Sequence, residues 1–95
     1  MNKEVLKIKN KIVPTLKEYN VTKASIFGSY ARGEQNKKSD VDIMIDIYRG
    51  TDLIELIRLK NKLEKIIKKK VDLVEYSGIR KELKSSILDN NIQIL

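Results

Sequence analysis

Two aspartates separated by one residue, Asp40 and Asp42, are the side chains whose spacing most directly suggests chemistry. They begin a segment, residues 40–48, in which apolar and polar residues alternate as in a β-strand with one buried face. In such a strand both carboxylates leave the same face, with Cα atoms about 7 Å apart. Two carboxylates whose charges approach to about 4 Å repel by about 4 kcal/mol at an effective dielectric constant of about 20. A hard divalent cation such as Mg²⁺ would offset that repulsion, because it prefers carboxylate, water and phosphate oxygens.

A third carboxylate, Asp72, lies in a later apolar segment, residues 71–76, which we also expect to be a strand. If this strand pairs beside residues 40–48, Asp72 can reach the same place as the first two aspartates. Three carboxylates and two Mg²⁺ ions would make the two-metal site of nucleotidyl transfer. Asp46 shares the face of Asp40 and Asp42 but sits further along the strand, and we interpret it as a surface residue.

Gly28 and Ser29 could hold the phosphates that such a site requires. They close a short apolar segment, residues 21–27, that we expect to be a buried strand. A strand that ends in Gly-Ser before a helical turn presents backbone N–H groups and a hydroxyl to phosphate oxygens. The glycine lets a phosphate approach closely because it has no side chain. Arg32, three residues later, can add the donors of its guanidinium group.

Each of these features has an ordinary structural explanation when it is taken alone. An Asp-x-Asp pair is often a solvated strand face, and Gly-Ser after a strand is often only a turn. Arg32 could be a surface residue, and Asp72 could pair with a nearby lysine. The combination is more specific, because Gly-Ser followed after ten residues by Asp-x-Asp should arise by chance in roughly one chain per thousand of this length.

The elements that must position these residues follow from hydrophobic spacing and from helix start and stop signals. We predict a helix over residues 3–19, kinked or divided at Pro14 and stopped at Asn20. A second helix begins with the pair Asp52 and Glu55 and runs to about Lys68. Its apolar side, expected in the core, consists of Leu53, Leu56, Ile57, Leu59, Leu63, Ile66 and Ile67. We also expect a helical turn over 30–33, a loop over 34–39, a helix over 78–88 capped by Ser77, a turn at Asn90-Asn91, and a short strand over 92–95.

This order of elements, α-β-β-α-β-α-β, predicts an α/β (α+β) fold in which helices cover a small mixed sheet. With 95 residues, the chain is expected to form one domain over residues 1–95. It contains no cysteine and no histidine, which excludes thiolate or histidine metal sites, cysteine nucleophiles and histidine general bases. Any chemistry must therefore use carboxylates, hydroxyls, Lys, Arg or a bound metal ion.

The net charge of +7 admits two interpretations. A basic balance is typical of proteins that bind nucleic acid, while an excess of Lys over Arg together with many Ile and Glu residues also suits a heat-adapted organism. No apolar run approaches the roughly 20 residues of a membrane span, and residues 1–5 lack the apolar core of a signal peptide. We therefore expect a soluble cytoplasmic protein that does not associate with a membrane.

The string GSYARGEQNKKSDVDIMID, residues 28–46, closely resembles the signature of the nucleotidyltransferase fold of the DNA polymerase β superfamily. More narrowly, it is similar to the minimal nucleotidyltransferases, the MNT or MntA-type antitoxins of HEPN/MNT toxin–antitoxin pairs. The resemblance extends over nearly the whole chain, since residues 71–74 match the family's third strand and residues 83–95 match its last helix and apolar tail.

That resemblance implies a role for each candidate residue. Asp40 and Asp42 would bind Mg²⁺, while Asp72 would complete the metal site and help to deprotonate the attacking hydroxyl. The pair Gly28-Ser29 would hold the nucleotide phosphates, with Arg32 in support. The implied reaction transfers AMP from ATP to a protein hydroxyl, typically a tyrosine of the HEPN toxin, and releases pyrophosphate.

Two other functions stay open from the sequence. The first is an antitoxin that keeps the motif but neutralises its toxin by contact alone. The second is a nucleic-acid-binding or RNA-modifying module, which the net charge favours. Against it, the chain offers only Phe27 and four tyrosines as stacking platforms and no basic recognition helix.

Overall fold

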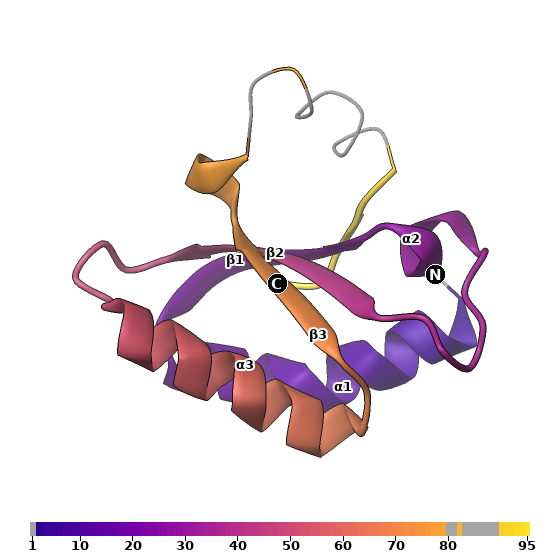
Figure 1. The fold of residues 1–95 in the computed structure, drawn as a ribbon, viewed down its shortest axis with the longest axis horizontal. Helices are drawn as coiled ribbons and strands as arrows, with labels where there is room; N and C mark the ends of the chain where they lie inside the picture. Colours follow the sequence, from indigo (N-terminus) through magenta and orange to yellow (C-terminus); the bar gives the residue numbers. More distant parts are fainter. Residues whose placement is uncertain (1, 80–81, 83–89) are drawn as a thin grey trace.

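Four strands form one mixed sheet in the computed structural model, which describes residues 2–79, 82 and 90–95 (Figure 1). Their order across the sheet is β3-β2-β1-β4. Strand β1 (Val21–Phe27) is antiparallel to both β2 (Val41–Ile47) and β4 (Ile92–Gln93), whereas β2 is parallel to β3 (Val71–Glu75). The predicted fold class is therefore confirmed.

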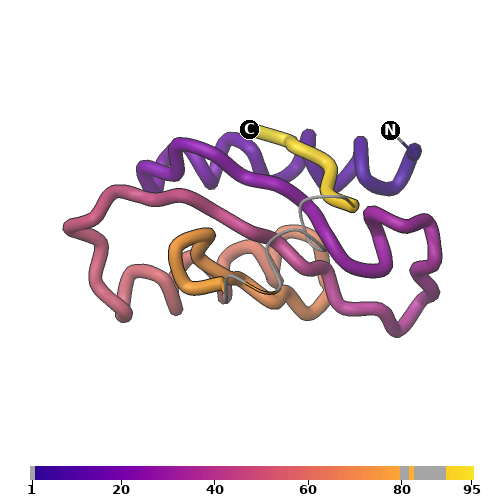
Figure 2. The backbone as a smooth tube through the Cα atoms, turned by 90° about the horizontal axis from the view of Figure 1, so that it is seen from above, coloured from indigo at the N-terminus to yellow at the C-terminus, as the bar shows by residue number. Residues whose placement is uncertain are grey.

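The predicted strands differ from the observed ones only at their ends. Strand β2 begins at Val41, so Asp40 precedes the strand instead of opening it. Strand β3 ends at Glu75, because the 3₁₀ turn η1 (Tyr76–Gly78) follows it directly. The last strand is short, but pairing continues beyond it, since the backbone N–H of Ala24 donates to the carbonyl of Leu95 at 3.1 Å. Figure 2 shows this C-terminal segment, in yellow, running beside β1.

Helices α1 (Lys3–Glu18) and α3 (Leu53–Ile67) lie side by side on one face of the sheet (Figure 1). Helix α1 is continuous through Pro14, so the expected alternative of two separate pieces is wrong. Pro14 faces solvent, where the carbonyl left without an intrahelical partner can bond to water. The helix ends as predicted, since Asn20 adopts a left-handed conformation with φ 63°. Within the described residues no helix is long and apolar enough to cross a bilayer.

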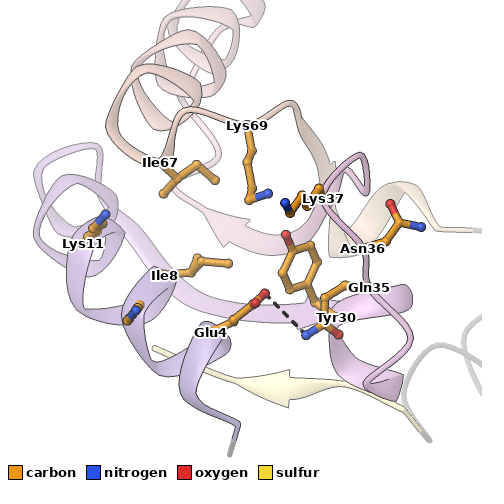
Figure 3. A pocket seen from close by; sticks show the side chains of 10 residues that line it. Glu4, Ile8, Lys11, Tyr30, Gln35, Asn36, Lys37, Ile67 and Lys69 are labelled. Atoms are coloured by element: carbon orange, nitrogen blue, oxygen red, sulfur yellow. Dashed lines mark hydrogen bonds between the residues drawn. The ribbon is translucent and has the colours of Figure 1, made fainter.

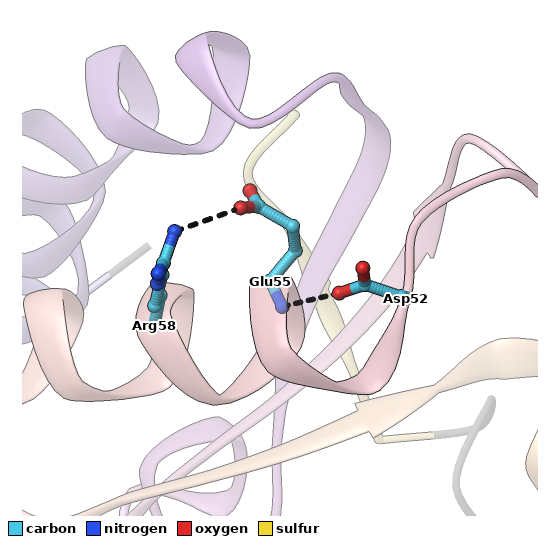
Figure 4. Close-up of polar contacts among 3 residues, drawn as sticks. All are labelled: Asp52, Glu55 and Arg58. Carbon is cyan, nitrogen blue, oxygen red and sulfur yellow. Dashed lines mark hydrogen bonds and ion pairs between the residues drawn. The ribbon is translucent and has the colours of Figure 1, made fainter.

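The start of α3 confirms the predicted capping pair (Figure 4). The Oδ1 atom of Asp52 accepts a hydrogen bond from the backbone N–H of Glu55 at 2.8 Å, which satisfies one of the free donors of the first turn. The Glu55 carboxylate in turn lies 3.4 Å from the guanidinium of Arg58. The helix ends at Ile67, and the next residue, Lys68, adopts a left-handed conformation with φ 57°.

Two residues predicted for the core face of α3 lie outside the core. Leu53 is 70% exposed and Ile57 is 49% exposed. The buried face of the helix centres on Leu59 and Leu63, with Leu56, Ile66 and Ile67 at its edges. Each residue turns the helix by about 100°, so Leu53 and Ile57 fall on the flank of the apolar stripe. The stripe is wider than the contact it makes with the rest of the molecule.

The core lies between the sheet and the two long helices. Alternate residues of β2 point into it, as the period-two pattern predicted. The buried apolar residues of the helices and the sheet are Val5, Ile8, Ile12, Leu16, Leu59 and Leu63, together with Val21, Ala24, Ile26, Val41, Ile43, Ile45, Val71 and Ile94. Tyr30 from the short helix α2 (Ser29–Arg32), which begins one residue earlier than predicted, joins the same cluster.

The opposite face of the sheet carries Ser25 and Met44, which are cross-strand partners and are both buried. The helix predicted over residues 78–88 falls mostly on residues outside the described part of the chain. In the part that is described, Ser77 and Gly78 belong to the 3₁₀ turn, and Ile79 is extended. Ser77 therefore does not cap a helix that begins at Gly78.

The buried and the exposed leucines of α3 should change the stability of the protein by different amounts when they are replaced by alanine. We expect Leu59→Ala to lower the free energy of unfolding by about 2–5 kcal/mol, because it removes buried methyl groups and leaves a cavity. Leu53→Ala should change it by less than about 0.5 kcal/mol, as is usual for exposed positions. Urea unfolding of both variants measures the difference. Equal losses would show that Leu53 is buried in solution.

Candidate functional site

The predicted site residues come together at the edge of the sheet where β1 ends and β2 and β3 begin. Asp42 lies opposite Phe27 of β1 on one side and opposite Asp72 of β3 on the other. Its neighbours Val41 and Ile43 are buried in the core beneath the sheet. Asp42 and Asp72 therefore leave the sheet on the face opposite α1 and α3, as residues alternate along a strand.

Gly28 is the residue against which the Asp42 side chain packs. It adopts φ 72° and ψ −147°, a backbone conformation that is essentially restricted to glycine. A Cβ atom placed on Gly28 would collide with Oδ2 of Asp42 and would lie 3.0 Å from its Cγ. Two independent constraints, one on the backbone and one on space, thus require glycine here.

Helix α2 follows at once and brings Ser29 and Arg32 to the same place. Its first hydrogen bond runs from the Arg32 backbone N–H to the Gly28 carbonyl at 3.2 Å. The helix stops after one turn because Gly33 takes a left-handed conformation with φ 71°. The chain then returns through the predicted loop to Asp40.

A cavity of about 600 Å³ opens between these elements. Five of the predicted residues line it: Gly28, Ser29, Arg32, Asp40 and Asp42. Phe27, Ser39 and Asn90 line it as well and were not predicted. Ser39 could have been found from its place beside Asp40, whereas Asn90 carries no local signal because the chain brings it here only by pairing β4 with β1.

Asp72 and Asp46 stand apart from this cavity. Asp72 is exposed and does not line it, although its strand places it directly beside Asp42. Asp46 pairs across the strands with Lys23, near the far end of β2. Asp46 therefore lies away from the other three aspartates, and its side chain is half-buried where the sequence predicted a surface residue.

Negative charge at this edge is only partly compensated. Burial raises the pKa of the Asp42 carboxyl above its usual value, and the charges of Asp72 and Asp40 raise this pKa further. Arg32 opposes the shift in pKa, but its Nε also lies 3.1 Å from the Glu34 carboxylate. The arrangement is therefore one that a bound cation would stabilise.

The donor set suits a hard cation such as Mg²⁺, because it consists of carboxylate and hydroxyl oxygens with no nitrogen or sulfur ligand. Among the described residues, however, no three carboxylates already form a cluster able to hold an ion by themselves. Phosphate oxygens and water would have to complete the coordination, which is the usual way Mg²⁺ is held with nucleotides.

Comparison with known proteins points to one family. The model of the family described as "Polymerase beta, Nucleotidyltransferase" matches residues 10–95. A Methanocaldococcus jannaschii protein, named as a candidate protein adenylyltransferase, is 46% identical over 88 residues, which are 93% of this chain and 95% of that protein.

Solved structures agree with this match. The structure of a candidate minimal nucleotidyltransferase is similar with a TM-score of 0.82 and 29% identity, over 97% of this chain and 95% of that one. A chain from the crystal structure of a toxin–antitoxin with AMP-PNP gives a TM-score of 0.80 and 28% identity. That match covers 92% of this chain and 72% of the other.

Two glycines with nearly the same φ allow a matched test of the contact between Gly28 and Asp42. Gly28→Ala should destabilise the protein by about 1–3 kcal/mol and should displace the Asp42 carboxylate. Gly33→Ala should cost about 1–2 kcal/mol for its left-handed backbone alone, because no atom lies within 4 Å of its added Cβ. Nucleotide affinity, measured calorimetrically, should fall in Gly28→Ala and be unchanged in Gly33→Ala. An equal loss in both variants would contradict a specific role for Gly28.

Asp42→Asn should stabilise the protein in the absence of metal and nucleotide at pH 7. The raised pKa of Asp42 means that the folded state holds its proton more tightly than the unfolded state. The free energy of unfolding therefore falls as the pH rises from the pKa of Asp42 in the unfolded state, about 3.9, to its higher pKa in the folded state. Above the folded-state pKa the full loss of stability is present. Thermal unfolding from pH 7 to pH 4 should show the variant's advantage narrowing as the pH falls. Asp46→Asn is the control on the same strand, and an advantage of Asp42→Asn that is independent of pH would contradict the electrostatic explanation.

Proposed function

The chain belongs to the polymerase beta nucleotidyltransferase family, and we propose that it transfers AMP from ATP to a tyrosine hydroxyl of a HEPN-family toxin, acting as the antitoxin in the cytoplasm. The observation that carries the proposal is the packing of the Asp42 carboxylate against Gly28, beside a cavity that Ser29 and Asp40 also line. The similarity to a candidate protein adenylyltransferase and to a toxin–antitoxin crystallised with AMP-PNP supports it.

Asp40 and Asp42, with Asp72 beside them, are the residues that would hold Mg²⁺, with two ions in the proposed active state. Bound there, the ions would neutralise charge on the phosphates and on the attacking oxygen. The raised pKa of Asp42 is consistent with this assignment, since its causes include the two other carboxylates.

Nucleotide phosphates would lie in the cavity against Gly28 and Ser29. Gly28 offers backbone without a side chain, and the Ser29 hydroxyl can donate to a phosphate oxygen. Arg32 lies at the cavity wall and can add charge-assisted donors if it leaves Glu34. The cavity of about 600 Å³ is within the range of small-molecule sites.

In the proposed reaction, the acceptor oxygen forms a bond to the α-phosphorus while the bond to the pyrophosphate oxygen breaks. The proton of the acceptor hydroxyl passes to Asp72, and pyrophosphate carries away the electron pair of the broken bond. Asp72 suits this role because it is exposed and lies on the neighbouring strand directly beside Asp42.

A partner protein is the proposed source of the acceptor. Holding a hydroxyl in line with the α-phosphate gives the large advantage of an intramolecular reaction. The cavity among the described residues contains the proposed phosphate-binding groups, but no tyrosine lines it. We therefore expect slow transfer by the isolated chain and fast transfer when the toxin is bound.

Intact-mass measurement of the toxin, after incubation with this protein, ATP and Mg²⁺, tests the proposal. The expected result is a mass increase corresponding to one or more AMP units. Asp72→Asn should slow transfer by about 100-fold or more, the usual contribution of a general base, and should leave complex formation intact. Asp46→Asn is the matched control and should transfer normally.

Two other outcomes would contradict this function, and a third would contradict only the role given to Asp72. An unmodified toxin that Asp72→Asn still neutralises would favour an antitoxin that acts by contact alone. Salt-dependent binding of RNA or DNA, without modification of the toxin, would favour a nucleic-acid-binding module. Normal transfer by Asp72→Asn would remove this residue from the mechanism.

A further inference from the structure

A second cavity, of about 400 Å³, lies on the other side of α2 and shares no lining residue with the first (Figure 3). It is an open cavity bounded by α1, the C-terminal end of α3 and the loop that follows α2. Part of its wall is apolar and consists of Ile8 and Ile67. The polar groups come from Tyr30, Gln35, Lys37 and Lys69. None of these residues takes part in the proposed transfer of AMP.

The hydroxyl of Tyr30 is the first sign that this cavity holds a ligand. Tyr30 is only 1% exposed, and its buried hydroxyl has no hydrogen-bond partner. Figure 3 shows this oxygen directed into the cavity, away from α2. Buried polar groups are nearly always hydrogen-bonded, so an unpartnered hydroxyl facing a cavity indicates a missing partner.

Gln35, in the loop that follows α2, also has a buried polar atom without a hydrogen-bond partner. Its Nε2 donates to the Glu4 carboxylate at 3.4 Å, and its buried Oε1 has no partner. These two atoms are the buried side-chain polar atoms without a partner in residues 2–79, 82 and 90–95, and both belong to residues that line this cavity. A ligand that satisfies both must accept from or donate to the tyrosine and donate to the glutamine.

Positive charge surrounds the cavity. Four lysines line it, Lys7, Lys11, Lys37 and Lys69, against the single acid Glu4. No ion pair within the described part of the chain neutralises these lysines. In Figure 3 the ammonium groups of Lys37 and Lys69 point toward the hydroxyl of Tyr30, so three potential donors converge on one point.

We propose that this cavity is a binding site for a small phosphate-bearing anion, whose phosphate group lies between Lys37, Lys69 and the Tyr30 hydroxyl. Phosphate oxygens accept strong charge-assisted hydrogen bonds from such donors. Near neutral pH a phosphate also retains an O–H group in part of its population, and this group can donate to the Glu4 carboxylate in the cavity wall. Sulfate has no such proton, so an acceptor in the wall favours phosphate.

The same site is placed to act on the first cavity, because helix α2 and the loop that follows it line both cavities. Helix α2 contributes Tyr30 to one cavity and Ser29 to the other. The next loop contributes Lys37 to one and Ser39 to the other. That loop is a closed turn, since the Asn36 backbone N–H donates to the Ser39 hydroxyl at 2.9 Å. An anion held by Lys37 would therefore fix the turn that leads into Asp40.

Thermal unfolding and calorimetry of the full chain with inorganic phosphate, without metal or nucleotide, test the proposal. At equal ionic strength, phosphate should raise the unfolding midpoint by binding the folded state, and sulfate should do so less. Tyr30→Phe and Lys37→Gln should each weaken phosphate binding about tenfold or more. Pyrophosphate, titrated in parallel, shows whether the site prefers a longer phosphate chain.

Matched variants separate this site from general effects of charge and from the first cavity. Tyr48→Phe and Lys60→Gln, at exposed positions, should bind phosphate normally. Ser29→Ala reports binding in the other cavity, which Ser29 lines, so comparing it with Tyr30→Phe shows which cavity holds the anion. Tyr30→Phe should be at least as stable as the natural protein in phosphate-free buffer, since it removes an unpartnered buried hydroxyl.

The proposal stands apart from transfer of AMP, because every readout is binding. No midpoint shift with phosphate or pyrophosphate would overturn it. So would binding that Ser29→Ala abolishes and Tyr30→Phe retains, which would place the anion in the first cavity. Equal stabilisation by sulfate would overturn the assignment of a phosphate ligand.

Discussion

The register between β1 and β2 is the constraint on which the rest of the site depends. It sets Phe27 opposite Asp42 and brings the next residue, Gly28, against the Asp42 carboxylate. The core enforces it, because Ile26 and Ile43 are cross-strand partners and both are fully buried. A slip by one residue would turn every side chain of β2 to the other face, burying Asp42 among leucines and isoleucines. Hydrophobic packing below the sheet therefore positions a carboxylate above it.

The register between β2 and β3 concentrates negative charge where the fold gains nothing from it. Asp72 lies beside Asp42 because the parallel pairing of β2 and β3 aligns Val41 with Val71, and both of those valines are buried. The neighbouring aspartate then raises the pKa of Asp42. A carboxylate that lowers stability at neutral pH is expected where the binding of a cation or another ligand offsets that loss. The electrostatic cost thus supports the functional interpretation independently of any similarity.

Local patterns in the sequence predicted most of the elements, and long-range contacts account for most of what they missed. Period-two alternation identified β2, and the Asp52–Glu55 pair identified the start of α3. Exposure of Leu53 and Ile57 could not be predicted, because it depends on how far the neighbouring elements extend over the helix. Asn90 joins the first cavity only through the pairing of β4 with β1. Tyr30 stands inside the string of residues 28–46, yet its hydroxyl is significant only because the fold buries it without a hydrogen-bond partner, beside a cavity that residues of α1 also line.

Tyr30 and Ser29 show how one turn of helix can serve two sites. Successive residues of a helix point about 100° apart, so a single turn can present side chains to opposite cavities. The core holds Tyr30 on one side, and the Gly28 backbone fixes the start of the turn on the other. A ligand that shifts the backbone of Tyr30 would move α2 as a unit, because a four-residue helix has no interior joint at which to bend. In the proposed arrangement, coupling between the cavities would follow from the shortness of this helix.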